Sequence, residues 1–312
     1  MTRHFLRDDD LTPAEQSEVL EQALELKAKP YSARPFEGPQ SVAMIFDKPT
    51  LRTQVSFAAA IAELGGNPML VDGALAGIGV RESVEDVARV LGRQVSAIVW
   101  RTFAQTSLDL MAAHAGVPVV NALTDEFHPC QLLADLRTVR EHRGDLAGQT
   151  VAFVGDGACN MGSSWLLAGT TAGMHVRIGA PEGYAPEAEM FEAATAVGAQ
   201  TGGSAVAVTD PVEAVTGADV VVTDTWVSMG KEDEAAQRLA VLSAYCVTSE
   251  LVAHARPDAI VMHCLPAYRG KEIAPEVIDG PQSVVWDEAE NRRHAQKAVL
   301  AFLAAATEGD TP

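Results

Sequence analysis

Short apolar runs alternate with longer amphipathic segments throughout the first half of the chain. Residues 52–66 and 83–95 place apolar side chains at helical spacing. Around these segments lie runs rich in valine and isoleucine, at residues 41–46, 68–72, 97–101 and 118–123. Strands with apolar interiors that are separated by helices are typical of parallel sheets covered on both faces. The pattern therefore predicts an α/β domain.

The second half of the chain repeats this alternation. Strand-like runs occupy residues 150–157, 175–181, 219–226, 259–266 and 283–288. A polar stretch with two glycines, residues 140–150, separates the two sets of strands, and residues 291–308 have the period of one amphipathic helix. We expect two doubly wound parallel-sheet α/β domains, residues 1–142 and 143–290, followed by a C-terminal helix within residues 291–312.

Composition narrows the class of protein. The chain has 312 residues, 47% hydrophobic and 21% charged, which fits a globular protein of about two domains. No apolar run approaches the ~20 residues that span a bilayer, and the charged start lacks the apolar core of a secretory signal. We therefore expect a cytoplasmic protein that does not bind membranes. The net charge of −19 argues against nucleic-acid binding, and four widely spaced cysteines predict neither a zinc site nor a disulfide framework.

Ligands of open parallel sheets bind beyond the carboxyl ends of the strands, so the residues that follow each strand are candidates. The first such stretch is "FDKPTLRTQVSF", residues 46–57. Pro49 ends the strand and Thr50 is a good N-cap, so a helix should begin near Thr50 or Leu51. The free amides of its first turn, together with Arg52, suit a phosphate or a carboxylate. An ordinary capped helix with a solvated arginine explains these residues equally well.

Three later strand ends carry polar groups. His128 and Gln131 in "DEFHPCQLLAD" could act with Arg101 to polarise a carbonyl oxygen, although a single histidine is more often a cap or core residue. Asp224 in "DTWVSMG" suits an ammonium group. Cys264 in "HCLPAYRG" lies in a strand-end turn, where a buried thiol usually serves packing.

The glycines of "VGDGACNMGSS", residues 154–164, suggest a dinucleotide site only loosely. Gly155 and Gly157 are followed by Gly162, which breaks the G-x-G-x-x-G spacing, and the next strand has no acidic residue at its tip. A dehydrogenase is therefore a distant alternative.

Together these motifs resemble those of the aspartate/ornithine carbamoyltransferase family, and most closely its ornithine carbamoyltransferases of actinobacterial type. The matching stretches include "FDKPTLRTQVSF", "WRTF", "FHPCQLLADLRT", "GDGACNMGSS", "DTWVSMG" and "HCLPAYRG", and the resemblance covers essentially the whole chain. It implies a carbamoyl-phosphate domain, an ornithine domain and a last helix that packs back on the first domain. It also implies homotrimers, or multiples of trimers, with active sites near subunit interfaces, and no metal or organic cofactor.

The resemblance implies a reaction of arginine biosynthesis. The side-chain amine of L-ornithine attacks the carbonyl carbon of carbamoyl phosphate, and citrulline and phosphate leave. By correspondence, the donor phosphate would be held by Thr50, Arg52, Thr53 and Arg101. The carbamoyl group would be surrounded by Arg101, His128, Gln131 and Arg292. The amino acid would be held by Asn160, Asp224, Ser228 and Met229, with Cys264 and Leu265 near its reacting amine.

The sequence departs from the family at the donor side. The family motif Ser-Thr-Arg-Thr-Arg is replaced by Thr-Leu-Arg-Thr-Gln at residues 50–54, so Leu51 removes a hydroxyl and Gln54 removes a positive charge. In the family, the loop at 72–83 carries polar residues, commonly a glutamine at the position of Gly77, and reaches a neighbouring subunit's donor site. Here residues 73–79 have no polar side chain. Cys159 stands where the family often has asparagine.

These departures leave three interpretations open. The first is a working ornithine carbamoyltransferase with a weaker donor site; related transferases of N-acylated ornithine carry leucine or methionine at the position of Leu51. The second is a paralogue with an altered donor or acceptor in specialised metabolism. The third is a non-catalytic relative that binds an amino acid or a partner subunit. Retention of Arg52, Arg101, His128, Gln131 and Arg292 argues against the third.

Overall fold

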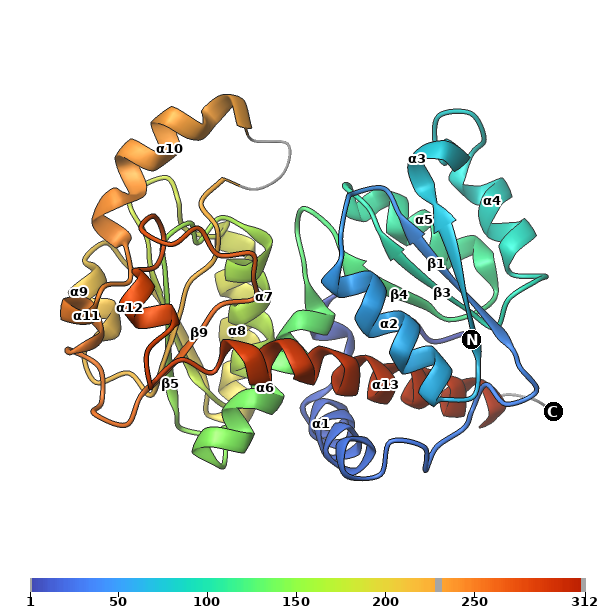
Figure 1. Ribbon diagram of the computed structural model, residues 1–312, viewed down its shortest axis with the longest axis horizontal. Coiled ribbons are helices and arrows are strands. Elements are labelled where there is room, and N and C mark those ends of the chain that lie inside the picture. Colours follow the sequence, from blue (N-terminus) through green and yellow to red (C-terminus); the bar gives the residue numbers. More distant parts are fainter. Residues whose placement is uncertain (1, 228–231, 310–312) are drawn as a thin grey trace. The chain divides into compact units, whose positions relative to one another are not determined.

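The computed structural model describes residues 2–227 and 232–309. The chain divides into two compact units, Met1–Ala134 with Glu290–Pro312, and Asp135–Ala289. Each unit holds one sheet whose paired strands are all parallel, and helices cover the sheets (Figure 1). The predicted architecture of two parallel-sheet α/β domains is confirmed.

The sheet of the first unit has the strand order β2-β1-β3-β4. Its strands are β1 (Ser41–Phe46), β2 (Asn67–Asp72), β3 (Ala97–Arg101) and β4 (Val119–Leu123). Phe46 pairs with both Asp72 and Arg101, so β1, β2 and β3 end at the same edge of the sheet. The segment that follows Phe46 and the side chain of Arg101 therefore meet at one place.

Helices pack around this sheet. They are α1 (Pro13–Ala28), α2 (Arg52–Glu63), α3 (Gly73–Ala76), α4 (Val84–Leu91), α5 (Gln105–Ala115) and the start of α6 (Pro129–Arg143). The predicted cap of α2 is wrong, because Leu51 rather than Thr50 occupies the N-cap position and its side chain offers no acceptor. The predicted helix over residues 83–95 is present as α4, and Ser83 caps it by accepting a hydrogen bond from the amide of Asp86.

The last helix, α13 (Val285–Gly309), packs on the first unit as predicted (Figure 1). Lys297 is fully buried, and its Nζ donates to the carbonyl oxygen of Leu26 at 2.8 Å and pairs with Glu63. The Nζ of Lys27 also donates to Asn291 Oδ1 at 3.0 Å. These bonds fasten the helix to α1 and α2, and they fix the position of Arg292, one residue after Asn291.

The sheet of the second unit has the order β7-β6-β5-β8-β9. Its strands are β5 (Thr150–Val154), β6 (His175–Gly179), β7 (Ser204–Val208), β8 (Val220–Val222) and β9 (Ile260–Met262). The helices are α7 (Asn160–Thr171), α8 (Ala188–Thr201), α9 (Pro211–Val215), α10 (Ala235–Leu242), α11 (Ser249–Val252) and α12 (Pro275–Ile278). Val222 pairs with Met262, so the residues after β8 and β9 emerge side by side.

Two strand predictions for this unit need correction. The edge strand β7 was not predicted, because its short sequence "SAVAV" is largely exposed and shows little contrast. Residues 283–288 were predicted as a strand, but only Ser283 bridges to Val261, and α13 begins at Val285 rather than at residue 291. Asp287 and Glu288 lie in the first turn of that helix, where the helix dipole favours negative charge.

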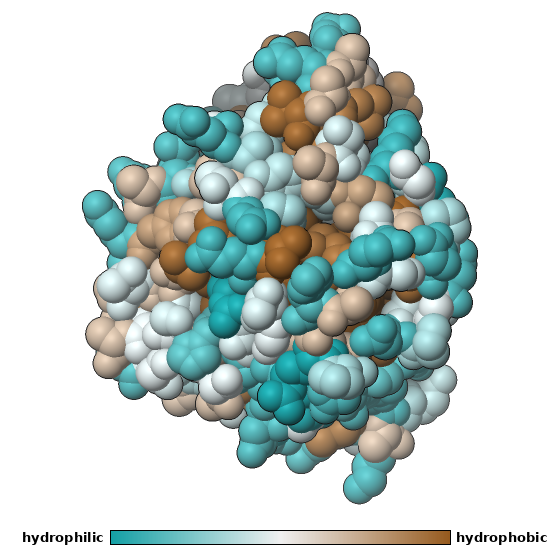
Figure 2. All heavy atoms as spheres, turned by 90° about the vertical axis from the view of Figure 1, so that its left-hand side faces the viewer, coloured by the Kyte–Doolittle hydropathy of each residue, from teal (hydrophilic) through white to brown (hydrophobic). Residues whose placement is uncertain are grey.

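Within residues 2–227 and 232–309, no helix combines the length and apolarity needed to cross a membrane. Figure 2 shows one face on which hydrophilic side chains predominate, with hydrophobic side chains gathered across its middle. Apolar atoms normally make up much of a protein surface, so this mixture needs no special explanation.

Candidate active site

Four predicted donor-site residues meet in the first unit. Thr53 lies in the first turn of α2, Arg101 ends β3, Gln131 lies in the first turn of α6, and Arg292 belongs to α13. Thr53 Oγ1 accepts hydrogen bonds from Arg292 Nη2 at 2.8 Å and from Arg101 Nη1 at 3.3 Å. Arg292 Nη1 also donates to Gln131 Oε1 at 2.5 Å. All four side chains are buried, so their geometry is fixed by packing.

This arrangement has a consequence for the hydroxyl of Thr53. A hydroxyl oxygen has two acceptor lone pairs and one hydrogen to donate. Because two guanidinium groups donate to Thr53 Oγ1, its hydrogen must point away from both of them. Thr53 and Gln131 are uncharged, so they orient the guanidiniums of Arg101 and Arg292 without neutralising them. Such a group is suited to bind an anion or a developing oxyanion.

His128 lies immediately before α6 and is buried. Burial lowers the pKa of His128 well below its usual value, and the nearby cations Arg292, Arg101 and Lys48 lower it further. The imidazole is therefore neutral at neutral pH. A neutral imidazole can still donate an N–H to a carbonyl oxygen, which is the role that the sequence suggested for it.

Lys48 is a buried cation of this site that sequence analysis did not select. It follows β1 by two residues, pairs with Asp125, and its Nζ lies 4.4 Å from the centroid of the Phe103 ring. Its position just past a strand end was the available signal, but a lysine there is more often solvated. Lys48 adds positive charge beside His128, since its field contributes to the lowered pKa of that residue.

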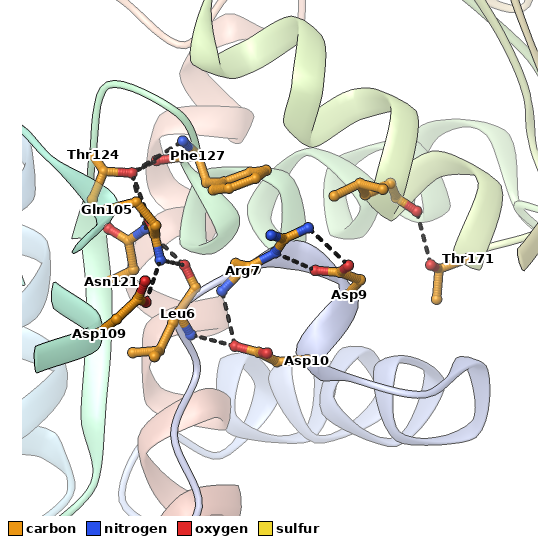
Figure 3. A network of polar contacts seen from close by, with 11 residues as sticks. Leu6, Arg7, Asp9, Asp10, Gln105, Asp109, Asn121, Thr124, Phe127 and Thr171 are labelled. Carbon is orange, nitrogen blue, oxygen red and sulfur yellow. Dashed lines mark hydrogen bonds and ion pairs between the residues drawn. The ribbon is translucent and has the colours of Figure 1, made fainter. Parts of the chain in front are cut away.

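The turn that precedes His128 rests on a network of buried polar side chains (Figure 3). Thr124 Oγ1 donates to Gln105 Oε1 at 2.9 Å and accepts from the amide of Phe127 at 3.1 Å. Asn121 Nδ2 donates to the carbonyl oxygen of Leu6 at 2.8 Å. The N-terminal segment, β4 and α5 thus hold this turn in one conformation.

The remaining donor-side predictions lie at the start of α2. Thr50, Arg52 and Gln54 are partly exposed, whereas Leu51 is 72% exposed. The hydroxyl of Thr53 and the partly exposed Arg52 therefore come from the same turn, which begins at a leucine that cannot cap it. The loop at 72–83 forms α3 and exposes Leu75 and Val80.

In the second unit, Asp224 and Cys264 lie together at the ends of β8 and β9. Cys264 Sγ donates to Asp224 Oδ1 at 3.3 Å. Burial raises the pKa of Asp224, and hydrogen bonds from the amide of Thr225 and from the thiol of Cys264 partly oppose that rise. A desolvated carboxylate is stabilised by a cation that enters the site, so this position suits a ligand ammonium group.

His263 lies beside this pair and is fully buried. Its Nδ1 accepts from the amide of Leu265 at 2.9 Å, and its Nε2 lies 3.3 Å from Glu272 Oε1. Potential metal-ligand atoms of Asp224, His263 and Cys264 all lie within 4.8 Å of one another. His263 would have to break one of its two bonds to coordinate an ion, so an acceptor pocket explains the group better than a metal site. His263 and Glu272 were not among the predicted site residues, since a histidine in a strand-end turn has no distinguishing local pattern in the sequence.

The other acceptor-side predictions lie near the start of α7. Asn160 is its first residue, and Cys159 occupies the N-cap. Burial raises the pKa of Cys159 well above its usual value, and Asp156 and Asp224 raise it further, so this thiol stays protonated. Ser228 and Met229, also predicted to hold the amino acid, lie outside the described residues.

Comparisons with known proteins identify the family of the chain. Residues 3–141 match the profile "Aspartate/ornithine carbamoyltransferase, carbamoyl-P binding domain", and residues 147–303 match the profile of the "Asp/Orn binding domain" of the same family. The chain belongs to the aspartate/ornithine carbamoyltransferase family, as its motifs predicted.

Within that family, several ornithine carbamoyltransferases are similar to this chain over nearly its whole length. The one from Clavibacter sepedonicus is 66% identical over 303 residues, 97% of this chain and 99% of that protein. The one from Leifsonia xyli subsp. xyli is 58% identical over 310 residues, 99% of each chain. The structure of the enzyme from Pyrococcus furiosus superposes with a TM-score of 0.92 at 44% identity, over 96% of each chain. The predicted actinobacterial likeness is confirmed by the first two.

Proposed function

We propose that this protein transfers the carbamoyl group of carbamoyl phosphate to the side-chain amine of L-ornithine, giving citrulline and phosphate. The observation that carries the proposal is the placement of Arg101 and Arg292 on the single buried hydroxyl of Thr53. The two relatives and the solved structure named above are all ornithine carbamoyltransferases, and none of them favours an altered reaction or a non-catalytic role.

The first unit would bind the donor. The phosphate would contact Thr53, Arg52, Thr50 and Arg101, because hydroxyls and guanidiniums at the start of a helix suit an anion. The carbamoyl oxygen would lie against Arg101, His128 and Arg292. Gln131 would form a hydrogen bond with the NH2 of the same carbamoyl group. These donors would stabilise the negative charge that the oxygen gains when the carbonyl carbon is attacked.

The second unit would bind the acceptor. Asp224 would pair with the α-ammonium group, Asn160, Ser228 and Met229 would hold the rest of the zwitterion, and Cys264 and Leu265 would lie near the reacting amine. That amine must be neutral to attack. A new C–N bond then forms, and the bond from carbon to the phosphate oxygen breaks. Phosphate leaves with the electron pair and can accept the one proton that the amine loses. Much of the acceleration would come from placement.

We further propose that the chain acts as a homo-oligomer, most simply a trimer. The first unit exposes apolar side chains on α2, β2 and the loop after it, namely Leu51, Val55, Leu70, Leu75 and Val80. A contiguous patch of exposed apolar side chains is typical of association surfaces, and we propose that these residues form one. A cytoplasmic location stays a prediction from the sequence.

The direct test is to incubate the purified protein with L-ornithine and carbamoyl phosphate and to measure citrulline. Arg101→Gln, which removes one guanidinium and keeps an amide, should lower turnover at least tenfold. Citrulline formation by the wild type that is lost in this variant supports the proposal. Transfer from another acyl phosphate, but not from carbamoyl phosphate, would instead assign a different donor.

A further inference from the structure

Leu265 has a backbone conformation that leucine rarely adopts. Its φ is 59°, and it is the one non-glycine residue with positive φ in the part of the chain that the structure describes. The left-handed region brings the Cβ of an L-residue too close to its own carbonyl oxygen, so surrounding contacts must hold such a residue in place. Leu265 directly follows Cys264, whose thiol bonds to Asp224.

The contact that holds Leu265 comes from His263. The amide of Leu265 donates to His263 Nδ1 at 2.9 Å, so this nitrogen carries a lone pair and no proton. The proton of the ring must therefore be on Nε2, which lies 3.3 Å from Glu272 Oε1 and donates to it. Glu272 also accepts from the amide of Tyr268. Histidine and glutamate are both buried, so water does not compete for either bond.

The backbone of His263 is fixed as well. Its amide donates to Glu288 Oε2 at 2.9 Å, and Glu288 is itself buried. The imidazole is thus oriented from three sides, by Glu272, by Leu265 and by the bond at its own backbone. Neither ring nitrogen is available to take a proton from a substrate without breaking a buried hydrogen bond.

We propose that His263 is a positioning residue that acts through this single tautomer. Glu272 keeps the proton on Nε2, and the Nδ1 lone pair then holds Leu265 in the left-handed conformation. That conformation sets the directions of the Cys264 thiol and the Leu265 carbonyl group at the acceptor pocket beside Asp224. The role assigned to this pocket rests on the proposed function, but the tautomer does not.

A matched pair of variants separates the two bonds of His263. The side-chain oxygen of asparagine can accept from an amide two residues further on, so His263→Asn retains the bond to Leu265 and loses the bond to Glu272. Glutamine reaches further, so His263→Gln can retain the bond to Glu272 and loses the acceptor for Leu265. We expect His263→Asn to keep the KM for ornithine within about threefold of the wild type, and His263→Gln to raise it at least tenfold. The KM for carbamoyl phosphate should change in neither variant.

Equal effects of the two variants on the KM for ornithine would overturn the proposal, as would equal changes for both substrates. Thermal unfolding of both variants shows whether a rise in the KM for ornithine comes from a loss of folded protein. The tautomer is tested without any activity measurement, by nitrogen NMR of wild-type protein labelled at histidine, with His263→Asn identifying the signal. A proton on Nε2 supports the proposal, and a proton on Nδ1 would refute it. If the wild type forms no citrulline but shows the Nε2 tautomer, the proposed function fails and the positioning of Leu265 stands.

Discussion

Arg292 Nη2 donates to Thr53 Oγ1 at 2.8 Å, across 239 positions of sequence. The same oxygen accepts from Arg101. One small hydroxyl therefore sets the separation and the direction of two guanidiniums that come from a strand and from the last helix.

Replacing Thr53 tests this relationship. Thr53→Val keeps the shape of the side chain but leaves two buried guanidiniums without this acceptor. A hydrogen bond to a charged group contributes roughly 1.5–3 kcal/mol, so donor affinity should fall at least tenfold. Thr53→Ser keeps the hydroxyl and should stay close to the wild type. Calorimetric titration measures the affinity of each variant for carbamoyl phosphate. Equal affinities of the valine and serine variants would show that the hydroxyl is unimportant.

Asp224→Asn tests the acceptor pocket. The amide lacks the charge that we assign to the α-ammonium group, so ornithine affinity should fall at least tenfold while carbamoyl phosphate affinity is nearly unchanged. Loss of both affinities together in a folded variant would contradict this role.

The pH dependence of ornithine binding follows from the same residue. Burial raises the pKa of Asp224. Only the ionised carboxylate attracts a cation, so ornithine affinity should decline as pH falls from neutral, at higher pH than an exposed aspartate would require. The decline should be absent in Asp224→Asn, and titrations of both proteins over pH would show it.

Leu51→Thr together with Gln54→Arg should strengthen the donor site. The threonine supplies a hydroxyl at an N-cap that Leu51 leaves without a side-chain hydrogen bond. Carbamoyl phosphate affinity should rise tenfold to a hundredfold, since a hydrogen bond to a charged group is worth about 1.5–3 kcal/mol. An added cap contributes about 0.5–2 kcal/mol, so the melting temperature should also rise. Ornithine affinity serves as the control and should not change. Unaltered donor affinity with tight binding by the wild type would identify both residues as neutral replacements.

His294 in α13 should make the free energy of unfolding depend on pH in the acid range. Burial lowers the pKa of His294 to about 4, and Lys297, Arg293 and Lys27 contribute to the shift while Glu290 opposes it. The unfolded chain takes up this proton near pH 6.5, whereas the folded protein resists it until about pH 4. The free energy of unfolding should therefore decrease as pH falls through this window, by at most about 3 kcal/mol.

The variant His294→Gln isolates this contribution. It cannot take up the proton, so its stability should fall less steeply than that of the wild type between pH 6.5 and 4. Urea unfolding at several pH values compares the two proteins. Parallel curves would show that His294 is not the group responsible.

The central strands could be predicted from the sequence because their composition is extreme. Residues 42–46 and 97–100 are apolar on both faces, and the structure places β1 and β3 at these residues. The strand predicted at 283–288 failed because a short apolar run fits a strand and the first turn of a buried helix equally well. The edge strand β7 was not predicted, because its alanines and exposed valines give little difference in hydrophobicity between its two faces.

The residues of the candidate site also fall into those that the sequence predicted and those that it did not. Thr50 and Arg52, at a helix start just after a strand, suggested an anion site, and Arg101 was expected near them because strand ends of parallel sheets gather at one edge. Thr53 was assigned to the site only by the family resemblance. No local pattern pointed to Arg292, which reaches Thr53 only through the packing of α13 on α1 and α2; the family resemblance alone supplied it. The orientation of His263 by Glu272 depends on a turn of nine residues whose path the sequence does not reveal.

The discontinuity of the first unit has a consequence for biosynthesis. The second unit is one continuous stretch, Asp135–Ala289, whereas the first unit includes Glu290–Pro312. A chain that emerges from the ribosome therefore has all residues of the second unit before it has Arg292 or the buried Lys297. Most of the first unit is synthesised first, but its core cannot be completed until residues of the segment Glu290–Pro312 have been synthesised. Termination of translation between Ala289 and Arg292 would leave a chain that has every residue of the second unit but lacks Arg292, the residue that we propose contacts the carbamoyl group.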